Sequence, residues 1–258
     1  MSILMAPVYS LSVNGQDLAE FGVYTSGEKT FDSDEKDFEF VSIPGRSGDL
    51  IRPNKRKKNS TVTYSCFIAE NFNANVMALR NFLETLPEAY VRIDDNRHPD
   101  EYRMGVHTGT VTFNVFGSAG NYEGATFDLQ FNVKPYRYLL SGERTVQLTG
   151  NGSITNPTNF TSKPLLQVFG NGSVTVNGND GKVYTATISN NNNKSIYLDC
   201  ETQNAYSMQG SGQAQSITYR NSDVVLSDHL YPVLTRGTIS IQLTGVTRVI
   251  ITPRWYRA

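Results

Sequence analysis

Hydrophobic and polar residues alternate along much of the chain. The clearest runs are residues 61–68 and 126–133, in which aromatic and aliphatic side chains take every second position and threonine, serine, asparagine, glutamine or aspartate take the others. This period of two is typical of a strand with one face on a core and the other in water, as in antiparallel sheets. Weaker runs of the same kind predict five further strands, at 110–116, 173–176, 183–188, 195–200 and 238–243.

Short turn signals separate these runs. Asn14-Gly15, Asn171-Gly172, Asn177-Gly178 and Asp180-Gly181 are pairs that accept the positive φ angles of tight hairpins. The Ile43-Pro44-Gly45-Arg46 segment is a further predicted turn. The chain therefore contains many short strands joined by tight connections.

One segment has the period of a helix. Its apolar positions recur three or four residues apart, at Phe72, Val76, Leu79, Leu83 and Leu86. Asn71 or Asn73 can cap its start, and Pro87 ends it.

The character of the chain changes near residue 140. A lone helix among strands predicts an α+β domain over residues 1–140, with an antiparallel sheet and one helix on it. Residues 141–258 carry little charge, and Asn, Gly, Ser and Thr fill the gaps between short strands, which predicts a β-sandwich. The predicted fold class is mainly β.

Composition excludes several classes of protein. The net charge of −1 argues against a chain built to hold nucleic acid. Cys66 and Cys200 each lie at an apolar position of a strand-like run, so we expect two buried thiols and no disulfide. No apolar run is long enough for a membrane helix, and the N-terminal residues make a poor signal peptide because they lack a basic region. We expect synthesis in a cytoplasm without export.

Residues that carry catalysis do not gather into a motif. His98, His107 and His229 form no close pair with each other or with a cysteine, and neither a nucleophile elbow nor a phosphate loop is present. The acidic residues within 94–101 do not follow the EF-hand pattern, and a polar loop explains them more simply. The sequence therefore predicts no enzyme, no metal site and no cofactor.

The most conspicuous charge feature is a change of sign. Residues 28–39 hold six acids and two lysines, and a basic run follows within RPNKRKK at 52–58. Two solvated loops, or a nucleic-acid patch, would explain this pattern. A third interpretation is that the acidic segment of one copy faces the basic segment of its neighbour, which would fix the register of an assembly. The candidate subunit-interface residues are Asp32, Asp34, Glu35, Asp37, Arg46, Arg52, Lys55, Arg56, Lys57 and Lys58.

Several segments in order carry a resemblance to a known family. They are FEFVSIPGRSGDLI (38–51), VTYSCFI (62–68), VRIDDNRHPDEYRMGV (91–106), FDLQFNVKPYRYLLSGE (127–143), NPTNFTSKPLLQVFGNGSVTVNG (156–178) and the ending ITPRWYRA (251–258). With these segments the chain resembles the distal tail proteins of long-tailed bacteriophages, a siphophage tail component.

The resemblance implies a structural protein of the virion tail tip. Family members have an N-terminal α+β domain and a C-terminal galectin-like β-sandwich, and they form hexameric rings. The resemblance also implies protein partners: the major tail tube protein, the tail-associated protein and, in many phages, receptor-binding proteins. DNA would only pass through the ring lumen, and no membrane is a partner. A prophage or tailocin hub is a close variant.

A rival interpretation is a stand-alone carbohydrate-binding module that acts in host-surface adhesion. Its candidate sugar-stacking residues are Trp255 and Tyr256, although packing in a core or between domains is the favoured role for Trp255. A glycosidase that uses the acids of 94–101 is a more distant third.

Overall fold

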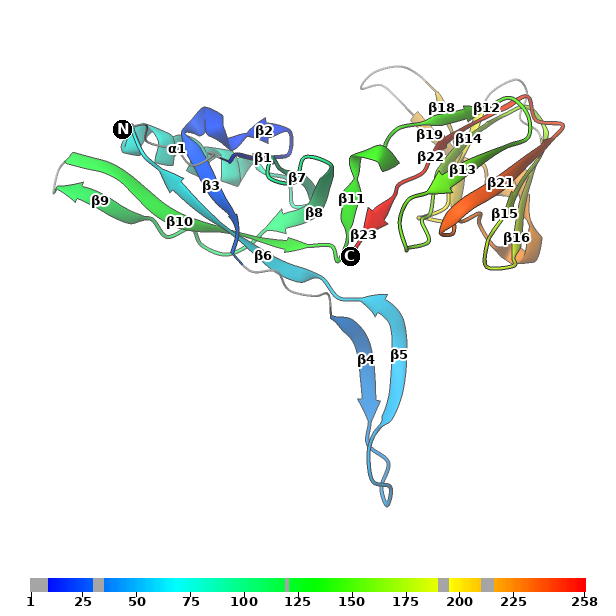
Figure 1. Cartoon of the computed structure of the whole chain (residues 1–258), viewed down its shortest axis with the longest axis horizontal. Coiled ribbons are helices and arrows are strands. Elements are labelled where there is room, and N and C mark those ends of the chain that lie inside the picture. The colour runs from blue at the N-terminus through cyan, green and yellow to red at the C-terminus, as the bar shows by residue number, and fades with distance from the viewer. Residues whose placement is uncertain (1–8, 30–34, 119–120, 190–194, 210–215) are drawn as a thin grey trace, which may run out of the picture. The chain divides into compact units, whose positions relative to one another are not determined.

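The computed structural model describes residues 9–29, 35–118, 121–189, 195–209 and 216–258. The chain forms two compact units, residues 1–137 with 258 and residues 138–257. The boundary expected from the sequence, at 140/141, lies close to this division. Figure 1 labels the elements, and each unit is described by itself.

Unit 1 is built on a large antiparallel sheet. The strand order is β2-β1-β7-β8-β10-β6-β3, and β9 also pairs with β10. The strands are β1 (Leu11–Val13), β2 (Gln16–Asp17), β3 (Val23–Glu28), β6 (Ser60–Ile68), β7 (Val91–Asp95), β8 (Glu101–His107), β9 (Asn114–Ser118) and β10 (Asn121–Val133). The predicted alternation is confirmed in β6 and β10, whose apolar residues are buried, among them Tyr64, Cys66, Leu129 and Phe131.

The predicted helix is α1 (Phe72–Thr85), and it packs on the buried face of this sheet through Val76 and Leu79. Asn71 does occupy the N-cap position, but its backbone is left-handed and its side chain makes no capping hydrogen bond. The helix ends just before Pro87, because proline cannot continue the hydrogen-bond ladder. A short 3-10 helix, η1 (Leu18–Phe21), lies between β2 and β3.

Two further strands of unit 1 stand apart from the large sheet. β4 (Lys36–Val41) and β5 (Leu50–Lys57) pair only with each other. Their sequence, rich in charge, gave no clear alternation. We call residues 35–58 the arm (Figure 1).

Unit 2 is a β-sandwich, as predicted. One sheet has the order β12-β22-β14-β17-β18-β19 and the other β13-β21-β15-β16-β20, and side chains from both form one core. The strands are β12 (Val146–Leu148), β13 (Gly152–Asn156), β14 (Leu165–Phe169), β15 (Gly172–Asn177), β16 (Val183–Ile188), β17 (Ser195–Asp199), β18 (Asn204–Gln209), β19 (Ser216–Tyr219), β20 (Val224–Leu226), β21 (Gly237–Thr244) and β22 (Arg248–Thr252).

Short elements complete unit 2. β11 (Arg137–Leu139) pairs with β23 (Tyr256–Arg257). The 3-10 helices are η2 (Leu140–Gly142), η4 (Asn221–Asp223) and η5 (Ser227–His229).

The predicted turns have mixed outcomes. Asn14-Gly15 closes a two-residue hairpin between β1 and β2, with φ of 52° and 82°. Asn171-Gly172 was expected to close a hairpin and does not, because β14 and β15 lie in different sheets. Gly172 instead has a φ of 137°, and a Cβ at this position would lie 2.1 Å from the carbonyl oxygen of Thr244.

Both cysteines are buried free thiols, as predicted. Burial raises the pKa of the Cys66 thiol to about 12, so the thiolate is not accessible at neutral pH. Cys66 and Cys200 therefore act as small core residues.

Candidate subunit interface

The tip of the arm is a tight turn. The backbone N–H of Arg46 donates to the carbonyl of Ile43 at 3.2 Å, and Gly45 has a φ of 80°. Proline followed by glycine with a positive φ is the signature of a type II turn. The turn predicted for residues 43–46 is therefore confirmed, and it leaves Arg46 exposed at the far end of the arm.

The acidic and basic segments singled out in the sequence face each other within one chain. Arg52 lies 3.5 Å from Glu39, Arg56 lies 2.6 Å from Asp37 and Lys58 lies 2.8 Å from Glu35. They are the two strands of one hairpin. The charge pairing that we expected between copies thus already occurs inside each copy.

A bulge next to Asp37 determines how these charges lie. Lys36 pairs with Lys57 and Phe38 with Pro53, so three residues of β5 stand opposite Asp37 alone. Lys55, in the middle of the bulge, has a left-handed φ of 53°. The hydrogen bond from Arg56, helped by one from Asn54, lowers the pKa of Asp37 below its usual value, so this carboxylate stays charged in mild acid.

The other candidate cations have different surroundings. Lys57 lies over the ring of Tyr136, with its ammonium 5.2 Å from the ring centroid. Arg46 and Lys55 are exposed and form no ion pair within the described part of the chain. Asp32 and Asp34 lie outside the described residues. Arg46 and Lys55, and with them the exposed Lys36 of β4, are therefore cations of the arm that are available to a second molecule.

The arm also has an apolar face that the sequence reasoning missed. Phe38 and Phe40 lie two residues apart on β4, opposite Pro53 and Ile51 of β5, so the four side chains share one face. Phe38 is 40% exposed, Phe40 63% and Ile51 57%. The signal was present in the alternation of Phe38-Glu39-Phe40, but the surrounding charges concealed it.

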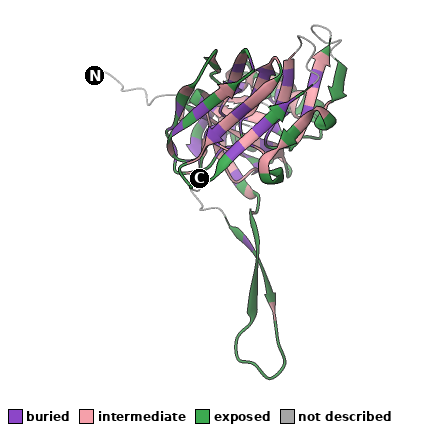
Figure 2. Cartoon of the chain, turned by 90° about the vertical axis from the view of Figure 1, so that its right-hand side faces the viewer, coloured by how far each residue is buried: buried purple, intermediate pink, exposed green. Residues whose placement is uncertain are grey.

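Exposure extends over nearly the whole arm, as Figure 2 shows. A two-stranded hairpin is only marginally stable by itself in water. Large exposed apolar side chains on such a ribbon are a mark of an interaction surface. The arm is therefore the candidate contact surface of unit 1.

Trp255 and Tyr256 do not form a sugar-stacking platform in this structure. Trp255 is 4% exposed within the core of unit 2, so no face of its indole is open to a ligand. The ring of Tyr256 stacks on Phe160 at 5.7 Å between centroids, and its hydroxyl donates to the carbonyl of Thr161. Packing explains both aromatic residues.

Two acids from the polar segment at 94–101 are held in ion pairs with arginines, Glu101 in a buried pair and Asp94 in a partly exposed one. Glu101 accepts from Arg137, and Arg137 also binds Glu28 at 2.8 Å. Arg103 lies 3.2 Å from Glu28, whose side chain is 2% exposed. Asp94, in turn, is held by its neighbour Arg92 at 2.7 Å.

Asp95 is the exception in this segment. It is 6% exposed, and its Oδ2 has no hydrogen-bond partner in the described structure. Burial raises the pKa of Asp95 above its usual value. A single unsatisfied carboxylate oxygen reduces stability and supplies no catalytic pair.

Within the described ranges, no group of three or more His, Cys, Asp or Glu residues could hold a metal ion. Among these same residues no helix is both long and apolar enough to cross a membrane.

The fold of this chain is similar to that of a solved bacteriophage protein. The solved structure is SPP1 Dit (gp 19.1), described as a paradigm of the hub adsorption apparatus in phages that infect Gram-positive bacteria. The two structures align with a TM-score of 0.65 and 13% sequence identity, over 95% of this chain and 98% of that one.

Comparison by sequence finds no relative: no family model and no curated protein matches this chain. The resemblance drawn from short segments is therefore confirmed at the level of the fold.

Proposed function

We propose that this protein is a structural component of a phage or prophage tail tip. It forms a hexameric ring hub that joins the tail tube to the tail-associated protein and to receptor-binding proteins. The observation that carries the proposal is the likeness to SPP1 Dit over 95% of the chain, including both units. The predicted galectin-like character of the sandwich and its role as an outward docking point belong to the same proposal.

The arm supports self-assembly. Its exposed Phe38, Phe40 and Ile51 would be covered when the arm lies on a neighbouring copy. A ring is the closed product of such a head-to-tail contact, in which one surface of each copy binds a different surface of the next.

Charge favours the same arrangement. The arm, residues 35–58, holds seven Lys and Arg against four Asp and Glu. The remainder of residues 1–137 holds seven basic against fourteen acidic residues. A basic arm is thus complementary to the acidic remainder of a neighbouring unit 1, which favours a defined register.

Lys55→Glu tests the electrostatic part of this proposal. Lys55 is exposed and makes no ion pair in the described residues, so its reversal disturbs folding little. We expect the variant to dissociate at a higher protein concentration than the wild type, and the difference to shrink at high salt. Lys163→Glu, an exposed lysine of unit 2, is the matched control. Equal assembly of Lys55→Glu and wild type at low salt would remove the charge argument and leave the apolar one.

A further inference from the structure

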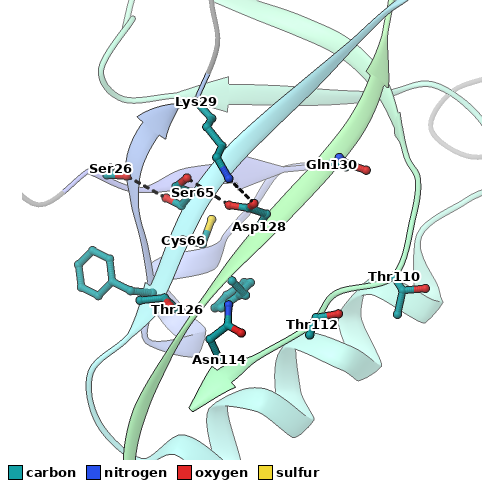
Figure 3. Close-up of a pocket in the computed structure, with 12 residues that line it drawn as sticks. Ser26, Lys29, Ser65, Cys66, Thr110, Thr112, Asn114, Thr126, Asp128 and Gln130 are labelled. Atoms are coloured by element: carbon teal, nitrogen blue, oxygen red, sulfur yellow. Dashed lines mark hydrogen bonds and ion pairs between the residues drawn. The ribbon is translucent and has the colours of Figure 1, made fainter. Parts of the chain in front are cut away.

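Unit 1 contains a groove of about 610 Å³ that the proposed ring function does not use. Figure 3 shows it on the polar side of the sheet, where strands β3, β6, β9 and β10 and the segment before β9 contribute side chains. Its volume is within the range of small-molecule sites, about 300–1,000 Å³.

The groove results from an interruption in the sheet. β8 and β9 both pair with β10 on the same side, β8 up to the pair His107–Phe131 and β9 from the pair Asn114–Thr126. Between these two pairs, the six residues 108–113 face only the four residues 127–130 of β10. The two additional residues bend the chain away from β10, as bulges do, and bulges often lie at functional sites.

The bent segment has two different sides. Thr110, Thr112 and Asn114 line the groove. Val111 and Phe113 belong instead to the hydrophobic core that α1 covers. The segment is thus anchored by its apolar side and presents a row of polar side chains on the other.

The polar side chains of the groove are free to bind. Five of these side chains, from two chain segments, make no hydrogen bond to another described residue: Thr110, Thr112, Asn114, Thr126 and Gln130. Together they offer three hydroxyls and two carboxamides, each able to donate and to accept.

The charges of the groove cancel. Lys29 binds Asp128 at 2.8 Å, and Ser65 donates to the other oxygen of the same carboxylate at 3.1 Å. An anion would meet one lysine that is already paired, and a hydrophobic ligand would leave the five polar groups unsatisfied, which is costly. The site suits a neutral ligand with many hydroxyl groups.

We propose that this groove binds a neutral saccharide. Vicinal hydroxyls of a sugar match the paired donor and acceptor of the Asn114 and Gln130 carboxamides. Phe67, also in the lining, supplies an aromatic surface for the C–H face of the ring. An extended peptide is less well matched, because it recognises long open strand edges through its backbone. β10 is paired with β6 along the whole groove and with β8 and β9 on either side of residues 127–130, so the open edge is only four residues long.

Saturation-transfer-difference NMR on the full chain tests the proposal, since the method tolerates large assemblies and weak binding. The probes are glucose, galactose, N-acetylglucosamine and their linear trimers. Glycerol and ribitol separate sugar rings from open-chain polyols, and an uncharged Ser/Gly-rich peptide represents the rival ligand. We expect transfer to at least one ring sugar.

Two variants connect binding to the groove. Gln130→Ala removes a carboxamide, and Thr112→Val removes a hydroxyl at constant shape. Each should weaken binding about three- to tenfold, the value of one hydrogen bond. Gln242→Ala, an exposed glutamine on a strand of unit 2, should leave binding unchanged.

Three results would overturn the proposal: no transfer to any ring sugar, binding that neither groove variant changes, or transfer only to an uncharged Ser/Gly-rich peptide. Light scattering on the same samples keeps this outcome separate from the ring, because the groove variants do not alter the arm.

Discussion

Phe40 is the side chain on which the proposed assembly should depend most. It lies on the apolar face of the arm and is 63% exposed in the single chain. Phe40→Ala therefore removes little that the isolated chain uses, and its free energy of unfolding should change by no more than about 0.5 kcal/mol.

The effect on assembly is expected to be much larger. A phenylalanine side chain buries roughly 200 Å² when fully covered. The exposed 63% corresponds to about 125 Å² that a neighbouring copy could cover. At about 25 cal/mol per Å², this area contributes about 3 kcal/mol to each contact. A loss of that size weakens each contact about 150-fold.

Sedimentation velocity over a dilution series measures this effect directly. The wild type and the control variant Tyr219→Ala, which removes an aromatic ring 70% exposed in unit 2, should dissociate at the same concentration. Phe40→Ala should dissociate at a far higher concentration, while its melting temperature equals that of the wild type at a dilution where both proteins are dissociated. Dissociation of Phe40→Ala at the wild-type concentration would refute the assignment of the arm as the contact surface.

Three other substitutions test the internal structure, each by its melting curve. Glu28→Gln removes the carboxylate that the buried Arg137 shares with Arg103, leaves Arg137 with Glu101 alone, and should cost about 3 kcal/mol. Asp95→Asn should stabilise the chain by about 1 kcal/mol at pH 7. Burial raises the pKa of Asp95 in the folded chain, so ionisation of this carboxyl lowers the free energy of unfolding. Below about pH 4 the carboxyl is protonated in the folded and in the unfolded chain, and the gain from Asp95→Asn should vanish. Gly172→Ala should cost about 2 kcal/mol, since its Cβ would meet the Thr244 carbonyl oxygen at 2.1 Å.

The sequence predicted those elements whose side chains sort cleanly between core and water. β6 and β10 alternate over eight residues with hardly an exception, and α1 has an unbroken apolar stripe. Such patterns predict the structure well, because the burial of one apolar face contributes most of the free energy that stabilises the element. The type II turn at residues 43–46 was equally predictable, because proline and glycine restrict the backbone by themselves.

The sequence located the acidic and basic segments, but it did not predict that their charges pair within one chain. Charge counts located residues 28–58, whereas their partners depend on β4 and β5 forming one hairpin with a bulge at Lys55. A left-handed lysine has no sequence signal, since few residues other than glycine, asparagine and aspartate prefer that conformation. Without the register, pairing between copies and pairing within one copy could not be distinguished.

Long-range contacts were beyond sequence reasoning altogether. Arg137 binds Glu28 across 109 positions of the chain, and nothing near either residue indicates the other. The groove at Gln130 could not be predicted either. It forms because residues 108–113 are two residues longer than the facing segment 127–130, and this difference follows from the register of the sheet and not from the local sequence pattern.

The mass of the assembled particle tests the central claim most directly. Light scattering coupled to size exclusion, with negative-stain images of the same peak, should give six times the 28.7 kDa of one chain and ring-shaped particles. A single species of 28.7 kDa at high protein concentration and low salt would contradict the account.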